Sequence, residues 1–205
     1  MRNIFIYGAG GHSKSLIGLI ESTKKYKIIG IIGLKKEVGK KICGYTVKYS
    51  DNDLERLSKH CKNIALAITF YKNLQDRGKF IAKLLKKKFK IPSIISPHSV
   101  LLKNIKIGDG VQIFHKVVIN TNSIVKNYCI VNNQSLVEHD VVLEENTHVS
   151  TGVIINGNCN IKRNTFIGSG SVIKENIKLK EGSFIKMFSK ITLSQWKKKP
   201  LLSLK

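Results

Sequence analysis

From Ile107 to Ile191, the chain places an aliphatic residue at every sixth position without an insertion. Most of these are followed, four residues later, by a small or β-branched side chain. A period of six fits neither the 3.6-residue repeat of an α-helix nor the two-residue alternation of a simple strand. It is typical of a solenoid of hexapeptide repeats. The fifteen aliphatic residues are Ile107, Ile113, Ile119, Val125, Val131, Val137, Leu143, Val149, Ile155, Ile161, Ile167, Ile173, Leu179, Ile185 and Ile191.

Three hexads should form one triangular coil, with the aliphatic side chain toward the axis and the small residue at the corner. At the usual strand spacing, about five coils give a prism on the order of 20–25 Å tall. Burying each aliphatic side chain contributes about 1.5–3 kcal/mol, so the register is fixed many times over. A sandwich of short strands would need turns at a spacing of about 8–12 residues, and the turns here do not fall there.

The hydrophobic pattern differs before the repeats. The stretch "NIFIYGAGGHSKSLIGLIEST" (3–23) reads as a buried strand, a glycine-rich turn and an amphipathic helix, and a second apolar strand follows at 26–34. This is the beginning of a βαβ unit. Residues 52–70 continue as helix and strand, 76–91 as a helix, and 92–99 as a linker into the coils. We therefore expect a Rossmann-like α/β domain at 1–92, a β-helix at 93–193 and a basic tail at 194–205.

The glycine-rich turn of the first unit is a candidate phosphate site. In a βαβ unit, such a turn presents backbone N–H groups and the positive end of a helix to a ligand. Gly8, Gly10 and Gly11 supply the turn, and His12 lies at the helix start. Plain packing of strand on helix explains the glycines as well, so both readings stay open. The second strand ends at Gly33 to Lys36 without the acidic residue of a dinucleotide site, which disfavours a dinucleotide dehydrogenase.

Composition and charge narrow the function classes. The formal charge of +23 favours anionic partners, although dispersed lysines in a chain rich in Lys, Ile and Asn are also explained by coding bias. Only 83–90 and 196–200 concentrate lysine, and neither interleaves aromatic residues, so nucleic-acid binding is not expected. Four cysteines without a CxxC pair indicate free thiols rather than a zinc site or a disulfide framework. No membrane-spanning run or signal peptide is recognisable, so we expect a cytoplasmic protein without membrane insertion.

The segment "SLVEHDVVLEENTHVS" (135–150) carries the clearest candidate chemistry. His139 and Asp140 stand side by side in the hexad pattern, and His148 follows nine residues later. Histidine accepts protons near neutral pH, and an adjacent carboxylate fixes the imidazole tautomer. Surface histidines are also common, and acidic residues on a basic protein balance charge. On the residues alone, a catalytic and a structural role for His139 are equally supported.

The combination of "GAGGHS", a βαβ domain of about ninety residues and "EHD…H" within in-register hexads resembles the hexapeptide-repeat sugar acetyltransferases of the sialic acid O-acetyltransferase family. This family includes enzymes that N-acetylate UDP-4-amino sugars. The resemblance implies a left-handed β-helix, which sequence alone does not indicate, because parallel crossovers are usually right-handed. It implies that His139 is the general base, that Asp140 assists it, and that the turn residues Gly8, Gly10, Gly11 and His12 hold a sugar or nucleotide-sugar substrate.

The resemblance also implies acetyl-CoA as co-substrate, bound in a groove between neighbouring prisms of a homotrimer. His148, Gly152, Gly168 and Ser169 are the residues that match its contacts. The acceptor attacks the thioester directly, so neither a metal nor a covalent enzyme intermediate is required. The oxyanion of the tetrahedral intermediate is stabilised by a fixed hydrogen-bond donor, for which a backbone N–H near Gly152 and the side chain of His148 are the candidates.

Several stretches depart from the family pattern. The acidic residues after the second strand are missing at 33–36, "AITFYKN" (67–73) lacks a Gly-Asn pair, "KMFS" (186–189) replaces a glycine-rich segment, and the terminus lacks a G-x-P-A motif. These departures argue against recognition of UDP by the N-terminal domain and against room for the pantetheine arm of CoA. The main alternative is a non-catalytic trimeric scaffold that keeps the β-helix and has lost the acceptor. The sequence does not decide between N- and O-acetylation or identify the sugar.

Overall fold

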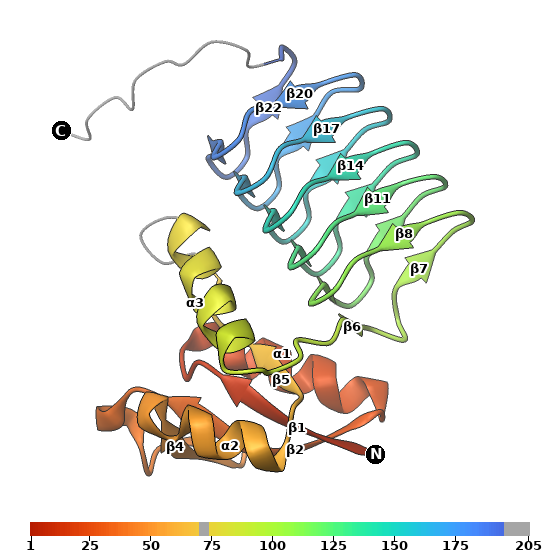
Figure 1. Ribbon diagram of the computed structural model, residues 1–205. Helices are drawn as coiled ribbons and strands as arrows, with labels where there is room; N and C mark the ends of the chain where they lie inside the picture. The colour runs from red at the N-terminus through yellow and green to blue at the C-terminus, as the bar shows by residue number, and fades with distance from the viewer. Residues whose placement is uncertain (70–73, 195–205) are drawn as a thin grey trace, which may run out of the picture.

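The computed structural model describes residues 1–69 and 74–194, which form an α/β layer at the N-terminus and a prism of stacked coils (Figure 1). The N-terminal sheet has the strand order β3-β4-β2-β1-β5. Its strands are parallel except β3, which pairs antiparallel with β4. The strands are β1 (Arg2–Tyr7), β2 (Tyr26–Gly33), β3 (Lys41–Ile42), β4 (Tyr45–Ser50) and β5 (Ile64–Leu66). The predicted βαβ unit is confirmed, whereas the β3–β4 hairpin was not anticipated.

Helices cover both faces of this sheet because side chains alternate along β1. Ile4 and Ile6 of β1 pack with α1 (Gly11–Thr23), whereas Phe5 and Tyr7 pack with α2 (Leu54–His60) and α3 (Leu74–Lys86). Short 3₁₀ turns follow β2 and β4 at η1 (Lys35–Glu37) and η2 (Asp51–Asp53). The result is a three-layer α/β/α arrangement, as expected of a Rossmann-like domain.

The prism is a left-handed parallel β-helix whose three faces are parallel sheets. Each strand has two residues and pairs with the strands one coil below and above. The first face contains β6 (Ile94–Ile95), β9 (Gln112–Ile113), β12 (Ile130–Val131), β15 (His148–Val149), β18 (Phe166–Ile167) and β21 (Phe184–Ile185). The second face contains β7 (Val100–Leu101), β10 (Val118–Ile119), β13 (Leu136–Val137), β16 (Ile154–Ile155), β19 (Val172–Ile173) and β22 (Lys190–Ile191). The third face contains β8 (Lys106–Ile107), β11 (Ile124–Val125), β14 (Val142–Leu143), β17 (Asn160–Ile161) and β20 (Lys178–Leu179).

The predicted period of six forms the core of the prism. The aliphatic side chains from Ile113 to Ile185 are buried together along the axis, and Ile107 and Ile191 pack against them at the two ends. The coils start earlier than the sequence pattern suggested, because Ile95 and Leu101 align with Ile113 and Ile119 of the next coil. The stretch 92–99, expected to be a linker, therefore already supplies the first strand of the first face.

The corners of the prism impose a second period of six that the sequence analysis did not use. One residue at each of fifteen successive corners has a positive φ, near the left-handed helical region. Asparagine and glycine tolerate this conformation best. They occupy ten of the fifteen positions, which are Asn104, Gly110, Lys116, Asn122, Tyr128, Gln134, Asp140, Asn146, Gly152, Asn158, Asn164, Gly170, Asn176, Gly182 and Phe188. Asp140 of the candidate pair is one of these corner residues.

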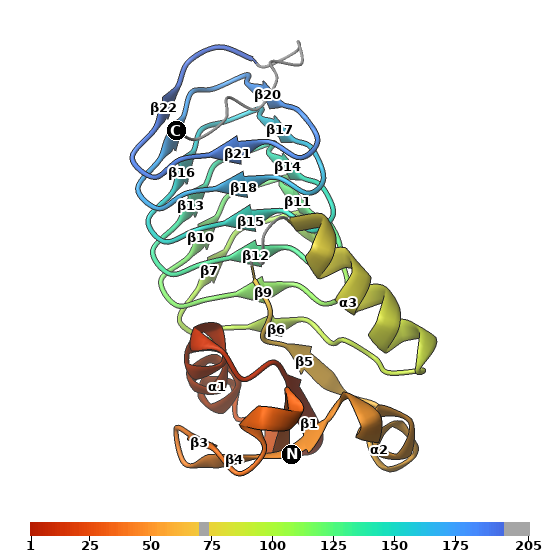
Figure 2. The same cartoon turned by 90° about the vertical axis from the view of Figure 1, so that its left-hand side faces the viewer.

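The N-terminal layer sits against the first face of the prism. Ile94, Phe114 and Ile130 of the coils join the hydrophobic cluster that contains α1. On the other side, Arg77 of α3 is buried and donates hydrogen bonds to the carbonyl oxygen of Tyr128 and to Asn146 at a corner of the prism. Figure 2 shows α3 running beside β12 and β15. The two parts of the chain therefore share a packed interface.

Two further findings concern the described residues. None of the helices in that part of the chain is sufficiently long and apolar to cross a membrane. All four cysteines are free thiols, with Cys61, Cys129 and Cys159 buried and Cys43 exposed.

Neighbouring isoleucines on β16 allow a matched test of the core. Ile155 is fully buried on the axis, whereas Ile154 points outward and is 36% exposed. Ile155→Ala should lower the free energy of unfolding by about 2–5 kcal/mol through lost burial and the cavity left behind. Ile154→Ala should lower the free energy of unfolding by well under half as much, because less apolar surface is lost. Urea unfolding followed by circular dichroism measures both, and equal effects would contradict the assigned register.

Candidate functional site

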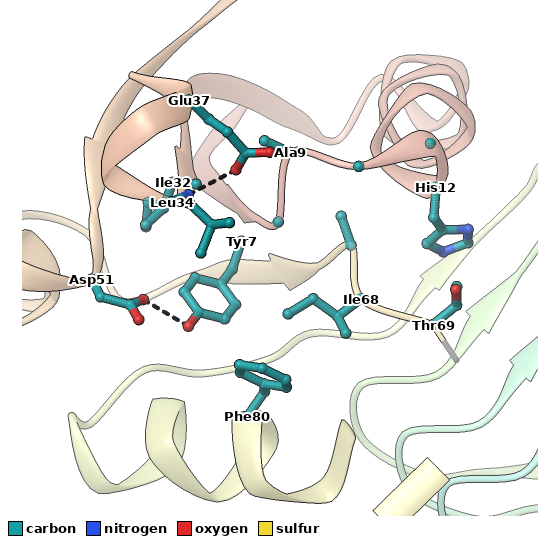
Figure 3. A pocket seen from close by; sticks show the side chains of 15 residues that line it. Tyr7, Ala9, His12, Ile32, Leu34, Glu37, Asp51, Ile68, Thr69 and Phe80 are labelled. Carbon is teal, nitrogen blue, oxygen red and sulfur yellow. Dashed lines mark hydrogen bonds between the residues drawn. The ribbon is translucent and has the colours of Figure 1, made fainter. Parts of the chain in front are cut away.

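A cavity of about 420 Å³ opens where the strands β1, β2 and β5 end, with α3 forming its far wall (Figure 3). The carboxyl ends of parallel strands are the usual ligand site of such sheets. All four predicted substrate residues, Gly8, Gly10, Gly11 and His12, line this cavity. Tyr7, Ile68 and Phe80 supply apolar surface around it. The structure thus brings the predicted turn residues together in one pocket.

The glycine-rich turn has the conformation that close ligand approach requires. Gly8 has φ +113°, and a Cβ there would lie 3.0 Å from the carbonyl oxygen of Ala67. At Gly10 and Gly11, an added Cβ would meet nothing within 4 Å. Helix α1 begins after Gly10 without a side-chain cap and without an acidic residue in its first turn. Its first N–H groups are available to an anion, whose charge the helix dipole favours.

Two carboxylates in the cavity were missed by the sequence analysis. Residues 33–36 contain no acid, as stated above, but the next residue, Glu37, lines the pocket, and its Oε2 accepts the N–H of Leu34 at 2.8 Å. Asp51, after β4, accepts a hydrogen bond from the hydroxyl of Tyr7 at 2.7 Å. Burial and Asp51 raise the pKa of Tyr7, which therefore stays a donor. Extending the search for an acid by one turn beyond β2 would have found Glu37.

His148 occupies the first face, where it faces the N-terminal layer. It belongs to an outward column that includes Gln112 below it and Phe166 above it. The side chain is buried, its ring meets Phe166 edge-on at 5.1 Å, and neither ring nitrogen has a hydrogen-bond partner among residues 1–69 and 74–194. Burial is the main cause that lowers the pKa of His148 to about 3, and repulsion from Arg77 and from a protonated His12 acts in the same direction. The imidazole is therefore neutral, with one donor and one acceptor unused.

His139 and Asp140 form a hydrogen-bonded pair at the corner between the second and third faces. His139 Nδ1 lies 2.8 Å from Asp140 Oδ2, while Asp140 Oδ1 accepts a hydrogen bond from Asn122 at 3.3 Å. The bonds from His139 and Asn122 lower the pKa of Asp140, so its carboxylate is charged. A charged carboxylate only accepts hydrogen bonds, so Nδ1 carries the proton. With Nδ1 as the donor, Nε2 is the ring nitrogen placed to accept a proton.

The ring of His139 rests on a glycine of the next coil. A Cβ at Gly157 would lie 2.6 Å from both Cε1 and Nε2 of His139. No side chain fits there without displacing the imidazole, because real Cβ atoms do not approach so closely. Gly157 is thus a feature of the site that the hexad pattern alone did not single out.

The predicted CoA residues other than His148 meet at a different corner, between the first and second faces. Ser169 Oγ bonds to Ser150 Oγ at 2.8 Å, and the N–H of Gly152 donates to the carbonyl oxygen of Asn133. That N–H is therefore already used inside the prism and is not a free oxyanion donor. One coil higher, Phe188 covers Gly170 with its ring edge and is 74% exposed. The "KMFS" side chains thus lie at the surface of this corner.

Within one chain, the predicted site residues fall into three separate places. His139 and Asp140 lie at the corner opposite the first face, which carries His148 and packs against the N-terminal layer. The corner with Gly152, Gly168 and Ser169 is separated from His139 by the whole second face. The departure at 70–73 and the tail at 195–205 lie outside the described residues.

The buried state of His148 leads to a prediction about acid stability. Its pKa is near 6.5 in the unfolded chain and about 3 when folded, so the unfolded state binds a proton first as the pH falls. The contribution of His148 to the free energy of unfolding is therefore constant above about pH 6.5 and decreases as the pH falls from there toward about 3. His148→Phe should flatten this decrease, measured by urea unfolding at a series of pH values, with His98→Phe at an exposed corner as control. An unchanged pH slope in His148→Phe would refute the assignment.

Comparisons with known proteins agree with both parts of the chain. Residues 3–84 match the PglD N-terminal domain family. The acetyltransferase domain of PglB from Neisseria gonorrhoeae superposes with a TM-score of 0.85 and 26% identity, covering 95% of this chain and 93% of that one. WeeI from Acinetobacter baumannii gives a TM-score of 0.82 and 25% identity, covering 95% and 93%. No curated protein matches the sequence.

The perosamine N-acetyltransferase of Caulobacter crescentus, whose structure was determined with CoA and GDP-perosamine, has the same fold. Its TM-score is 0.87 at 20% identity, over 95% of this chain and 90% of that one. The likeness to these proteins extends through the N-terminal domain and the whole β-helix. Residues 3–84 therefore carry a PglD N-terminal domain, and over both parts the chain is similar to hexapeptide-repeat sugar acetyltransferases.

Proposed function

We propose that the protein transfers the acetyl group of acetyl-CoA to an amino or hydroxyl group of a nucleotide-sugar, with His139 as general base. The main support is the hydrogen-bonded pair at the corner of the prism. Asp140 accepts a hydrogen bond from His139 Nδ1–H, and Nε2 remains available to accept a proton. His139 is 58% exposed, so an acceptor can reach it. The related PglB domain has also been determined with acetyl coenzyme A.

The reaction follows from this geometry. The acceptor nitrogen or oxygen attacks the thioester carbonyl carbon while Nε2 of His139 takes its proton. The new carbon–nitrogen or carbon–oxygen bond forms a tetrahedral intermediate, which collapses as the carbon–sulfur bond breaks. The imidazolium returns the proton to the departing CoA sulfur. Asp140 stabilises the imidazolium in between, as the acid of a catalytic triad does.

The N-terminal cavity is the proposed site for the nucleotide-sugar. Its open helix start suits a diphosphate, and Glu37 offers a carboxylate oxygen for hydroxyl groups. A carboxylate beyond the second strand is how βαβ domains hold a ribose. Glu37 can therefore take the place of the acidic residues that are missing at 33–36 and that a nucleotide site needs. The sugar acceptor fits a role in surface polysaccharide or glycan synthesis in the cytoplasm.

A homotrimer is part of the proposal because one chain does not assemble the site. A second copy must bring its corner with Gly152, Gly168 and Ser169 toward His139 for both substrates to meet. The second face between these corners supports such contact, since Val100 and Ile154 expose apolar surface there at 51% and 36%. In this arrangement, acetyl-CoA lies between neighbouring prisms.

The first test is release of free CoA thiol from acetyl-CoA with a panel of UDP-amino sugars, GDP-perosamine and sialic acids. His139→Ala should reduce turnover by about 100-fold or more, because it removes the base. Asp140→Asn should reduce it less, and His60→Ala, at the exposed end of α2, should leave it unchanged. Turnover that survives His139→Ala would overturn the assignment of the base. If the wild-type protein releases no CoA thiol with any acceptor of the panel and calorimetry detects no binding of acetyl-CoA, the scaffold alternative is favoured.

Gly157→Ala tests the position of the base without removing it. The new methyl group needs the space of the His139 ring, so the imidazole must move and kcat should fall by about tenfold or more. Gly18→Ala on the exposed side of α1 is the control, because a Cβ there meets nothing within 4 Å. Thermal unfolding confirms that both variants are folded. An unchanged kcat for Gly157→Ala would show that His139 need not rest on this glycine.

A further inference from the structure

Gln112 joins the β-helix to the substrate cavity through two hydrogen bonds. It lies on β9, points from the first face into the N-terminal layer and is 2% exposed. Its Nε2 donates to the carbonyl oxygen of Leu66 at 2.8 Å, and its Oε1 lies 3.0 Å from Nε2 of His12. Leu66 immediately precedes the cavity-lining residues Ala67 and Ile68. One side chain therefore fixes two walls of the pocket.

These bonds determine which nitrogen of His12 carries a proton. A backbone carbonyl only accepts hydrogen bonds, so the amide NH₂ of Gln112 must face Leu66. Its oxygen then faces His12, and the His12 nitrogen opposite that oxygen must be a donor. His12 Nε2 is thus protonated. The reverse amide orientation would set two oxygen atoms 2.8 Å apart, which is repulsive.

The other nitrogen of His12 is consequently an acceptor. Burial, opposed by the Gln112 bond and assisted by the charge of Arg77, lowers the pKa of His12, so the ring is neutral. A neutral ring protonated at Nε2 has a lone pair at Nδ1. No hydrogen bond to Nδ1 occurs among residues 1–69 and 74–194, and His12 lines the cavity.

We propose that Gln112 is a positioning residue that holds His12 as the Nε2–H tautomer, so that Nδ1 accepts a hydrogen bond from a hydroxyl or amino group of the sugar. This rests on the function proposed above. A phosphate is the wrong partner for Nδ1, because its oxygens accept hydrogen bonds and would face a lone pair. The cavity is thereby divided, with phosphate at the N–H groups of α1 and a donor of the sugar at His12.

The tautomer can be measured without any ligand. Long-range ¹H–¹⁵N correlation at neutral pH separates protonated from unprotonated imidazole nitrogens, and His12→Gln identifies the His12 signals among six histidines. We expect a protonated Nε2 and an unprotonated Nδ1. In Gln112→Glu, the carboxylate still accepts from Nε2 and should hold a second proton on Nδ1. An Nδ1–H form in the wild-type protein would overturn the proposal, whether or not acetyl transfer is observed.

Kinetics test the consequence for the substrate. Gln112→Leu should raise the KM for the nucleotide-sugar acceptor about 3- to 10-fold, the cost of a neutral hydrogen bond, with the KM for acetyl-CoA unchanged and kcat within about twofold. Gln112→Glu should raise the acceptor KM at least as much, although it is nearly isosteric, because Nδ1 becomes a donor. Asn3→Asp, which adds the same charge at the far end of β1, is the matched control.

A purely structural role makes a different prediction. Gln112→Leu and Gln112→Glu both lose the bond to Leu66, so a purely structural role would raise the acceptor KM of Gln112→Glu by an amount that does not change with pH, or would raise the KM of both substrates together. Either result would refute the proposal. Raising the pH should restore the acceptor KM of Gln112→Glu as Nδ1 loses its proton. Arg77 and His148 are the other ionisable groups whose charges couple with that of His12. Thermal unfolding verifies that each variant is folded.

Discussion

The structure depends on a register of six residues that is fixed from the inside and from the corners at once. Inside, the aliphatic side chains stack along the axis and lose their burial if the chain slips by one residue. At the corners, every sixth residue has a positive φ that most side chains resist. Neither constraint alone explains why fifteen successive turns are identical. Together they produce a rigid prism on which outward side chains keep fixed positions.

That rigidity gives the candidate base its geometry. Asp140 stands at a corner position with φ 60°, where its short polar side chain is among the tolerated choices, and Asn122 and His139 each bond to one of its oxygens. Gly157, one coil above, leaves room for the imidazole ring. The candidate catalytic pair is therefore built on the same repeat that makes the core, with small changes at three corners of one edge.

The interface between the two parts of the chain is the other functional element. Gln112 reaches the substrate cavity from the prism, while Arg77 of α3 reaches the prism from the layer that walls this cavity. Polar side chains buried in such an interface must find specific partners, which fixes the relative position of the parts. His148 differs from these two side chains, because its nitrogens have no hydrogen-bond partner in the part of the chain that the structure describes.

The sequence by itself determined the β-helix, the βαβ unit and the pairing of His139 with Asp140. These are periodic or local features, set by side chains one, four or six residues apart. It did not locate Glu37, Gly157 or Gln112, whose importance comes from residues distant in the chain. Gly157 matters because His139 lies one coil below it, and Gln112 because Leu66 and His12 come to it from another domain. The separation of His148 from His139 follows from the sequence, because a nine-residue spacing is half of the predicted eighteen-residue coil. The tertiary structure decided that the face with His148 packs against the N-terminal layer, which buries the imidazole.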